Sequence, residues 1–357
     1  MDELRRYSVE LIGSFFIAMS IVMSQSSALH KVELALLYGA LLYALNSQSK
    51  SGATFNMSVS IAKSITGKLG RGDLLVATLG QISGIVLGAG FGFCLHQNEM
   101  IIIVYGNRDG TEKIAPSELL LGFLFSFLLS LVGSNASSEL TIAYPIAMMA
   151  SIIAGGMTSK FPAPFTAFNP LAELIFLTDS AFYVVFLTVL SYLMGGILGG
   201  YYSLFMLTSE RRRGDRLVGL SDIMESAQNS APFDYQSWIV GVTLEGIGSF
   251  YITLVFALAG GVNDDTWIIA VGSIVLTLTF LSIRGYFNPA VTLAFYIQDR
   301  NCFQPSMSTL SLFSYMFSQL LFAVAASWIA LWIGDGLIRI PSVSKRADNQ
   351  NQRHLVE

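Results

Sequence analysis

The sequence has little charge, few cysteines and few histidines, and each shortage excludes a class of function. Charged residues make up 12% of the 357 residues, and 20 basic and 24 acidic residues leave a net charge of −4. The basic residues form no single patch, so we expect no nucleic-acid partner. Cys94 and Cys302 fall in no CxxC or Cys/His pattern, and the three histidines are scattered along the chain. This favours free thiols, with no metal site, no cofactor and no catalytic cluster. We therefore predict that the protein is not an enzyme.

Long apolar stretches take the place of charge. Hydrophobic residues make up 53% of the chain, and the mean hydropathy is +0.60. A bilayer core of about 30 Å needs about 20 apolar residues in a helix. Stretches of this kind predict an all-α, multi-pass integral membrane protein with about nine spans, surrounded by lipid of a membrane that the sequence does not identify. The first stretch is expected to be a retained helix. The expected spans are 8–27, 32–46, 74–95, 118–134, 140–158, 181–207, 238–260, 267–282 and 308–333.

A short phrase occurs three times inside these apolar stretches. Its copies are Phe55-Asn56-Met57-Ser58, Phe168-Asn169-Pro170-Leu171 and Phe287-Asn288-Pro289-Ala290. Irregular backbone at membrane depth is tolerated only beside a cavity or inside protein. Proline directly after the asparagine suits the first turn of a helix, because its missing N–H costs nothing there. Each phrase therefore predicts a re-entrant loop followed by a half-helix.

The phrases are about 115 residues apart, a spacing that suits a three-helix unit. The sequence then divides into a first repeat (1–100), a second repeat (115–207), a polar linker (208–236), a third repeat (237–335) and a polar tail (336–357). Three spans are an odd number, so the second repeat must enter the membrane inverted relative to the other two. This predicts that the N-terminus and the linker share one side of the membrane, and that the C-terminus lies on the other.

The three loops resemble those of the aquaporin (major intrinsic protein) family. Residues 51–56 and 287–295 are similar to the family's first re-entrant loop, and residues 167–171 are similar to a degraded second loop. The resemblance covers 1–207 as a six-helix module and 237–335 as an additional half. It implies a channel for water or small neutral solutes such as glycerol. Glu10, Glu245, Gln81 and Gln319 fall where the family places a membrane-embedded glutamate and glutamine.

In such a fold, two opposed half-helices meet at their N-termini. Their dipoles oppose cations and protons, and the paired asparagine amides donate hydrogen bonds to a passing oxygen. Only oppositely oriented repeats can pair, so Asn56 pairs with Asn169, or Asn169 pairs with Asn288. The first pairing is preferred because its order matches the family. One repeat is then left over, which favours a homo-oligomer or a larger membrane complex.

The sequence also departs from the family at its filter. The position of the family's filter arginine holds Ala172, and the other expected filter positions hold Leu36 and Met157. Thr166 stands where mercury-sensitive members have cysteine. Met57 and Leu171 further alter the loop motif. These residues predict a wide, apolar filter that passes glycerol as well as water, or, as the alternative, a non-conducting scaffold or accessory subunit that keeps the fold.

Several membrane-embedded residues allow a purely structural interpretation. Glu10 and Glu245 either extend to the membrane surface or orient the loops. Gln81 and Gln319 are expected to form hydrogen bonds between helices. The glycine pairs at 195–196 and 199–200 are expected to allow close helix packing. The three loop asparagines are expected to cap their half-helices in either case.

Overall fold

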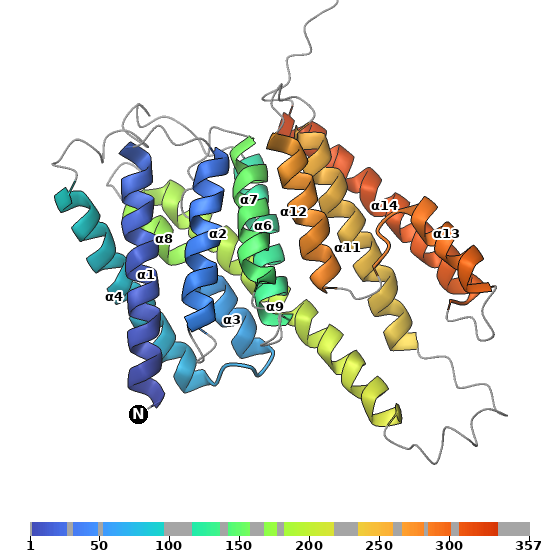
Figure 1. The fold of residues 1–357 in the computed structure, drawn as a ribbon, viewed down its shortest axis with the longest axis horizontal. Helices are drawn as coiled ribbons and strands as arrows, with labels where there is room; N and C mark the ends of the chain where they lie inside the picture. Colours follow the sequence, from blue (N-terminus) through green and yellow to red (C-terminus); the bar gives the residue numbers. More distant parts are fainter. Residues whose placement is uncertain are drawn as a thin grey trace, which may run out of the picture.

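The computed structural model describes eleven segments of the chain: 2–26, 31–48, 53–95, 116–135, 142–157, 168–176, 182–217, 235–259, 266–281, 285–300 and 307–334. Every regular element in these segments is a helix (Figure 1), so the all-α prediction is confirmed for the described residues. The helices group by repeat.

Each repeat contributes two long helices, a shorter apolar helix and a half-helix that follows the Phe-Asn phrase. The first repeat contains α1 (Asp2–Ser26), α2 (Lys31–Gln48), α3 (Met57–Ile65) and α4 (Arg71–Leu95). The second contains α6 (Pro116–Asn135), α7 (Ala143–Met157), α8 (Pro170–Glu173) with the 3₁₀ turn η1 (Leu174–Phe176), and α9 (Phe182–Leu217). The third contains α11 (Tyr235–Ala259), α12 (Thr266–Leu281), α13 (Pro289–Arg300) and α14 (Thr309–Gly334).

The long helices fit a multi-pass membrane protein. Within the described residues, six helices are long and apolar enough to cross a bilayer, namely α1, α4, α6, α9, α11 and α14. The apolar parts of α2, α7 and α12 are shorter, although these helices lie at expected spans. The total of nine spans therefore stays a prediction.

Small residues allow the long helices of a repeat to approach closely. α1 packs on α4, α6 on α9, and α11 on α14. An ideal Cβ on Gly84 would lie 2.3 Å from the Leu11 carbonyl oxygen, and one on Gly195 would lie 2.4 Å from that of Phe123. Only glycine fits at such contacts, since backbone atoms cannot move aside. Gly196 has the same relation to Ser58 of α3, so the glycine pairs of α9 pack against two neighbours, which is the expected packing role.

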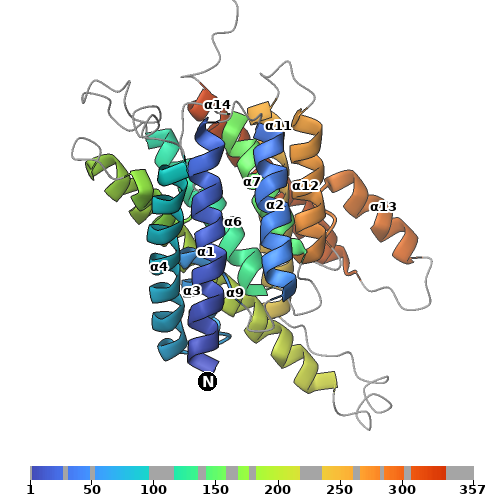
Figure 2. The ribbon, with the colours of Figure 1, turned by 60° about the vertical axis from the view of Figure 1, so that its left-hand side comes forward.

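The third repeat lies beside the second. α12 packs on α7, and α11 contacts both α7 and α9. The Tyr251 hydroxyl donates a hydrogen bond of 2.6 Å to the Leu124 carbonyl oxygen across this boundary. In Figures 1 and 2, α13 lies at the outer edge of the molecule, beside α14 and away from the first repeat. α1 begins at the same end of the molecule at which α9 ends, and α14 ends at the opposite end (Figure 1).

Candidate functional site

The three Phe-Asn loops have the same backbone geometry. Phe55, Phe168 and Phe287 have positive φ angles of 53°, 53° and 51°. A bulky residue in this left-handed region costs about 1–2 kcal/mol, so the surrounding structure must hold it there. The next residue in each loop is the asparagine, and a helix starts directly after it.

Each asparagine caps the half-helix that follows it. The Oδ1 atom of Asn56 accepts a hydrogen bond from the Ser58 N–H at 2.9 Å. Asn169 accepts one from the Leu171 N–H at 3.1 Å, and Asn288 accepts one from the Ala290 N–H at 2.9 Å. These bonds satisfy one of the unpaired donors at each helix start. They also turn each amide group so that its nitrogen points out of the loop.

The first two loops meet inside the molecule. The Asn169 amide nitrogen donates to the Phe55 carbonyl oxygen at 2.9 Å, and the Asn56 amide nitrogen donates to that of Phe168 at 3.4 Å. Both asparagine side chains are about 2% exposed. Because these residues cap α3 and α8, the two half-helices point their N-termini at each other. The structure brings Asn56 and Asn169 together and leaves Asn288 apart from them.

A small cavity lies beside this asparagine pair, with a volume of about 10 Å³. That is about the space one water molecule needs. An amide group carries two N–H donors. The hydrogen bond of Asn169 to the Phe55 carbonyl oxygen uses one of them, which leaves the other donor for the cavity that Asn169 lines. The lining residues are Ile17, Tyr38, Leu42, Phe55, Asn56, Tyr144, Met148 and Asn169.

The expected filter residues occupy different surroundings. Leu36 is 51% exposed on α2 and does not line the cavity, whereas Tyr38 on the same helix is fully buried and does. Ala172 is fully buried next to the second loop. Thr166 and the side chain of Met157 lie outside the described residues. Reasoning from the sequence therefore missed the two tyrosines at the cavity, Tyr38 and Tyr144.

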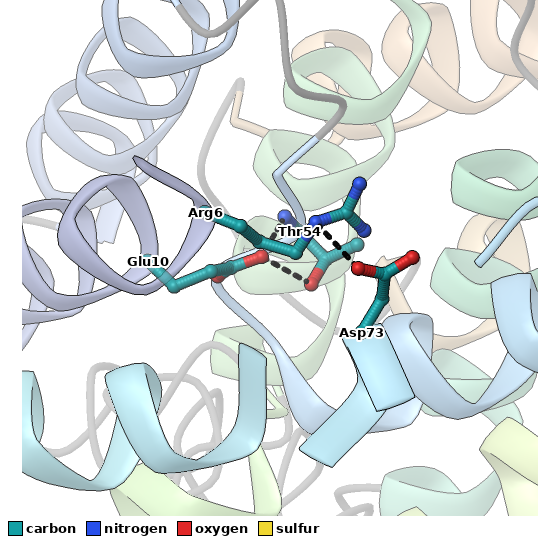
Figure 3. Close-up of polar contacts among 4 residues, drawn as sticks. All are labelled: Arg6, Glu10, Thr54 and Asp73. Atoms are coloured by element: carbon teal, nitrogen blue, oxygen red, sulfur yellow. Dashed lines mark hydrogen bonds and ion pairs between the residues drawn. The ribbon is translucent and has the colours of Figure 1, made fainter. Parts of the chain in front are cut away.

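Glu10 holds the first loop in place from α1. Its Oε1 atom accepts hydrogen bonds from the Thr54 N–H at 2.8 Å and the Thr54 hydroxyl at 3.1 Å. Its Oε2 atom accepts from the Phe55 N–H at 2.9 Å and the Gln81 amide at 3.1 Å. Figure 3 shows the contact with Thr54. The side chain is 2% exposed, so Glu10 orients the loop and does not extend to the surface.

Glu245 repeats this arrangement in the third repeat. Its carboxylate accepts hydrogen bonds from the Tyr286 N–H at 2.9 Å, the Phe287 N–H at 2.6 Å and the Gln319 amide at 2.8 Å. Gln319 also donates to the Thr292 hydroxyl at 2.8 Å. The loop of the third repeat is therefore built like that of the first. Both glutamines join helices within their repeat, as expected for such residues.

The second repeat replaces the glutamate and glutamine by a glycine and a tyrosine. Gly84 of α4 packs on Leu11, and Gly195 of α9 packs on Phe123 in the same manner. This correspondence places Gly122 where the first repeat has Glu10, and Tyr192 where it has Gln81. An ideal Cβ on Gly122 would lie 2.5 Å from Cε1 of Tyr192. The tyrosine ring therefore fills the space that the glutamate occupies in the first repeat.

An ion pair lies near the glutamate network. The Nε atom of Arg6 lies 3.6 Å from Oδ1 of Asp73, so the pair links α1 to the start of α4 (Figure 3). The two side chains are 21% and 38% exposed. Solvent screens such a pair, so it contributes little to stability.

A larger pocket of about 320 Å³ lies between α4 and the segment α8–η1. Its lining residues are apolar, and neither loop asparagine is among them. It offers no donor to orient a solute, so we place the candidate site at the smaller cavity beside Asn56 and Asn169. Within the described residues, no cluster of His, Cys, Asp or Glu could hold a metal ion.

Comparisons of the chain with protein-family models, curated proteins and solved structures gave no match.

Proposed function

We propose that the chain is an aquaporin-like membrane channel for water and small neutral solutes, with its pore between the first and second repeats. One observation carries the proposal: two buried loop asparagines donate hydrogen bonds across to each other's loop, beside a cavity of the size of a water molecule. A structural cap needs only the Oδ1 atom of each asparagine. The remaining Asn169 donor suits a passing oxygen.

The half-helix dipoles support selectivity for neutral solutes. α3 and α8 point their N-termini at the asparagine pair, and each terminus has an effective charge of about half a positive unit. In a low-dielectric interior this charge opposes protons and other cations. No arginine reinforces the barrier at Ala172, so we expect cation exclusion to be less complete than with a charged filter.

The width of the pore decides which solute passes. In this conformation Tyr38 and Tyr144 line a cavity of about 10 Å³, which has space for about one water molecule and none for glycerol. We therefore expect the proposed channel to prefer water. Glycerol passes only if the tyrosine side chains move away from the asparagine pair.

Flux measurements on purified protein in liposomes test this proposal. Stopped-flow light scattering against osmotic gradients should give a water permeability above that of empty liposomes. Asn169→Ala should reduce it to background, because it removes both the donor and the cap. Asn288→Ala is the matched control, since the same change is made in a loop outside the pore, and should leave the flux unchanged. Tyr38→Ala should raise glycerol flux by widening the cavity.

The second candidate is a non-conducting scaffold, and the small volume of the cavity favours it. A pore closed by buried tyrosines keeps the fold without conducting. Background permeability for both the natural protein and Tyr38→Ala, with each eluting as a single folded species, would exclude the channel and leave the scaffold.

A further inference from the structure

The third repeat carries a fully built loop that nothing in the described structure covers. Its phenylalanine has the positive φ angle of the other two loops, its glutamate holds two loop N–H groups, and Asn288 caps α13. Yet Asn288 is exposed, whereas Asn56 and Asn169 are buried. A loop held this firmly is not a degraded remnant.

The half-helix that follows this loop is uncovered as well. Ser58, Val59, Ser60 and Ala62 of α3 are buried. On α13, by contrast, Val291 is 49% and Ile297 58% exposed. In the membrane, an apolar helix surface of this kind tolerates lipid. The broken backbone and amide at Asn288 do not, because lipid tails offer no hydrogen-bond acceptor.

The hydrogen bonds of the loop show which group lacks a partner. In the first loop, the Phe55 carbonyl oxygen accepts from Asn169 of the opposing loop. In the third loop, the Phe287 carbonyl oxygen accepts instead from the Ser249 hydroxyl of its own repeat, at 2.8 Å. The Asn288 amide has its Oδ1 bonded to Ala290, and within the described residues its nitrogen donates to nothing. The amide nitrogen of this exposed residue is the group that requires an acceptor.

We propose that the third repeat is one half of a second asparagine-paired site, which an oppositely oriented half repeat of another polypeptide completes. The partner presents a re-entrant loop whose carbonyl oxygen accepts from Asn288, and whose amide donates to the second lone pair of the Phe287 carbonyl oxygen, beside the bond from Ser249. The first two repeats are the template for this contact, because each of their asparagines donates to the opposite loop. The proposal does not require that the first pore conducts.

The orientation of the repeats argues against a second copy of this chain as the partner. Asn56 and Asn169 cap α3 and α8 and bond to each other's loop, and the two half-helices lie on opposite sides of this contact, with α3 nearer the end at which α1 begins (Figure 1). A second copy inserted the same way round presents its own third loop from the same end, so the two half-helices cannot meet at their N-termini. The second repeat of such a copy is already paired with its first. The partner is therefore an inverted half repeat from a different chain.

A fusion protein tests whether this surface accepts an inverted half repeat. The full chain is followed by a second copy of residues 115–207, in which the copied Leu171 is replaced by cysteine. Ala290→Cys is introduced in the third repeat, and Cys94 and Cys302 are replaced by serine. We expect a disulfide between the two engineered cysteines. Asn288→Ala should lower the cross-linked fraction about fivefold, the effect of losing one hydrogen bond.

The matched control keeps the appended 115–207 with its copied Leu171→Cys and moves the other cysteine from Ala290 to Phe317, which is 69% exposed on α14. This position lies outside the loop of the third repeat, so it should not form the disulfide. Equal cross-linking in the two fusion proteins, or cross-linking in neither when both are inserted and folded, overturns the proposal.

A second measurement uses the natural chain in membranes of its source cell. A photoreactive amino acid replaces Val291, next to the loop, or Phe317, which is 69% exposed on α14 and serves as the control. Sequencing of the cross-linked peptides should identify a loop of another polypeptide at position 291 only. Adducts with lipid alone, or with residues 285–300 of a second copy, would contradict the proposed partner.

Discussion

The first and second repeats hold almost identical loops by different means. Phe55 and Phe168 share the φ angle of 53°. In the first repeat a buried carboxylate, Glu10, accepts hydrogen bonds from the loop backbone. In the second repeat the corresponding position is Gly122, and the ring of Tyr192 occupies the space. The first loop is held by charge-assisted hydrogen bonds, and the second is held by packing against the Tyr192 ring.

The phenylalanine rings show the same difference. An ideal Cβ on Gly13 would lie 2.2 Å from Cε1 of Phe55, so that ring lies directly on the backbone of α1. The Phe168 ring instead packs between Phe125 and Tyr192, at centroid distances of 5.2 and 6.0 Å. The same loop conformation is thus maintained by the backbone of α1 in the first repeat and by two aromatic rings in the second.

Removing the buried carboxylate should have the largest effect. Glu10→Ala leaves the Thr54 and Phe55 N–H groups buried without acceptors, at about 1–3 kcal/mol for each group. We expect the free energy of unfolding to fall by about 2–6 kcal/mol, measured by denaturant titration in detergent. Glu10→Gln keeps one acceptor oxygen and should lose less. An unchanged stability of Glu10→Ala would show that the loop does not depend on this carboxylate.

A smaller effect should follow from crowding the second repeat. Gly122→Ala places a methyl group against the fully buried Tyr192 ring, and overpacking of this kind costs about 1–3 kcal/mol. Gly90→Ala is the control, because an ideal Cβ there meets no atom within 4 Å.

Placing the side chains of the first repeat in the second tests whether Gly122 and Glu10 occupy equivalent positions. The double variant Gly122→Glu with Tyr192→Gln installs the glutamate–glutamine pair in the second repeat. It should be more stable than the sum of its two single changes predicts, since each new side chain supplies the other's partner. If the stability changes of the two single variants simply add, the new glutamate and glutamine do not contact each other. Positions 122 and 192 would then not be equivalent to those of Glu10 and Gln81.

The sequence predicts the helices and loops well because both depend on local pattern. Apolar stretches about as long as a bilayer is thick coincide with α1, α4 and α11, and each Phe-Asn phrase coincides with a loop and a helix start. The asparagine fixes the start of the helix through its own side chain. These features need no knowledge of distant contacts.

The cavity lining could not be predicted in the same way. α2 is apolar all round, so its sequence does not distinguish the exposed Leu36 from the buried Tyr38. The replacement of Glu10 by Gly122 suggests a lost contact, whereas the structure shows Tyr192 filling the space. Such compensation depends on residues 70 positions apart, which pack together only in the folded chain.

The smallest effect should come from the ion pair that accompanies Glu10 in the first repeat. Arg6 and Asp73 lie 3.6 Å apart and are partly exposed, so water and salt screen their attraction. We expect Asp73→Asn to lower the free energy of unfolding by less than about 1 kcal/mol, and this loss should vanish at high salt. Comparing the unfolding of Asp73→Asn with that of Arg6→Gln and the double variant isolates the pair, because an interaction makes the double change cost less than the two single changes together. A loss as large as that of Glu10→Ala, or one that salt does not reduce, would show that the ion pair stabilises the first repeat as much as the buried carboxylate does and is not screened by solvent.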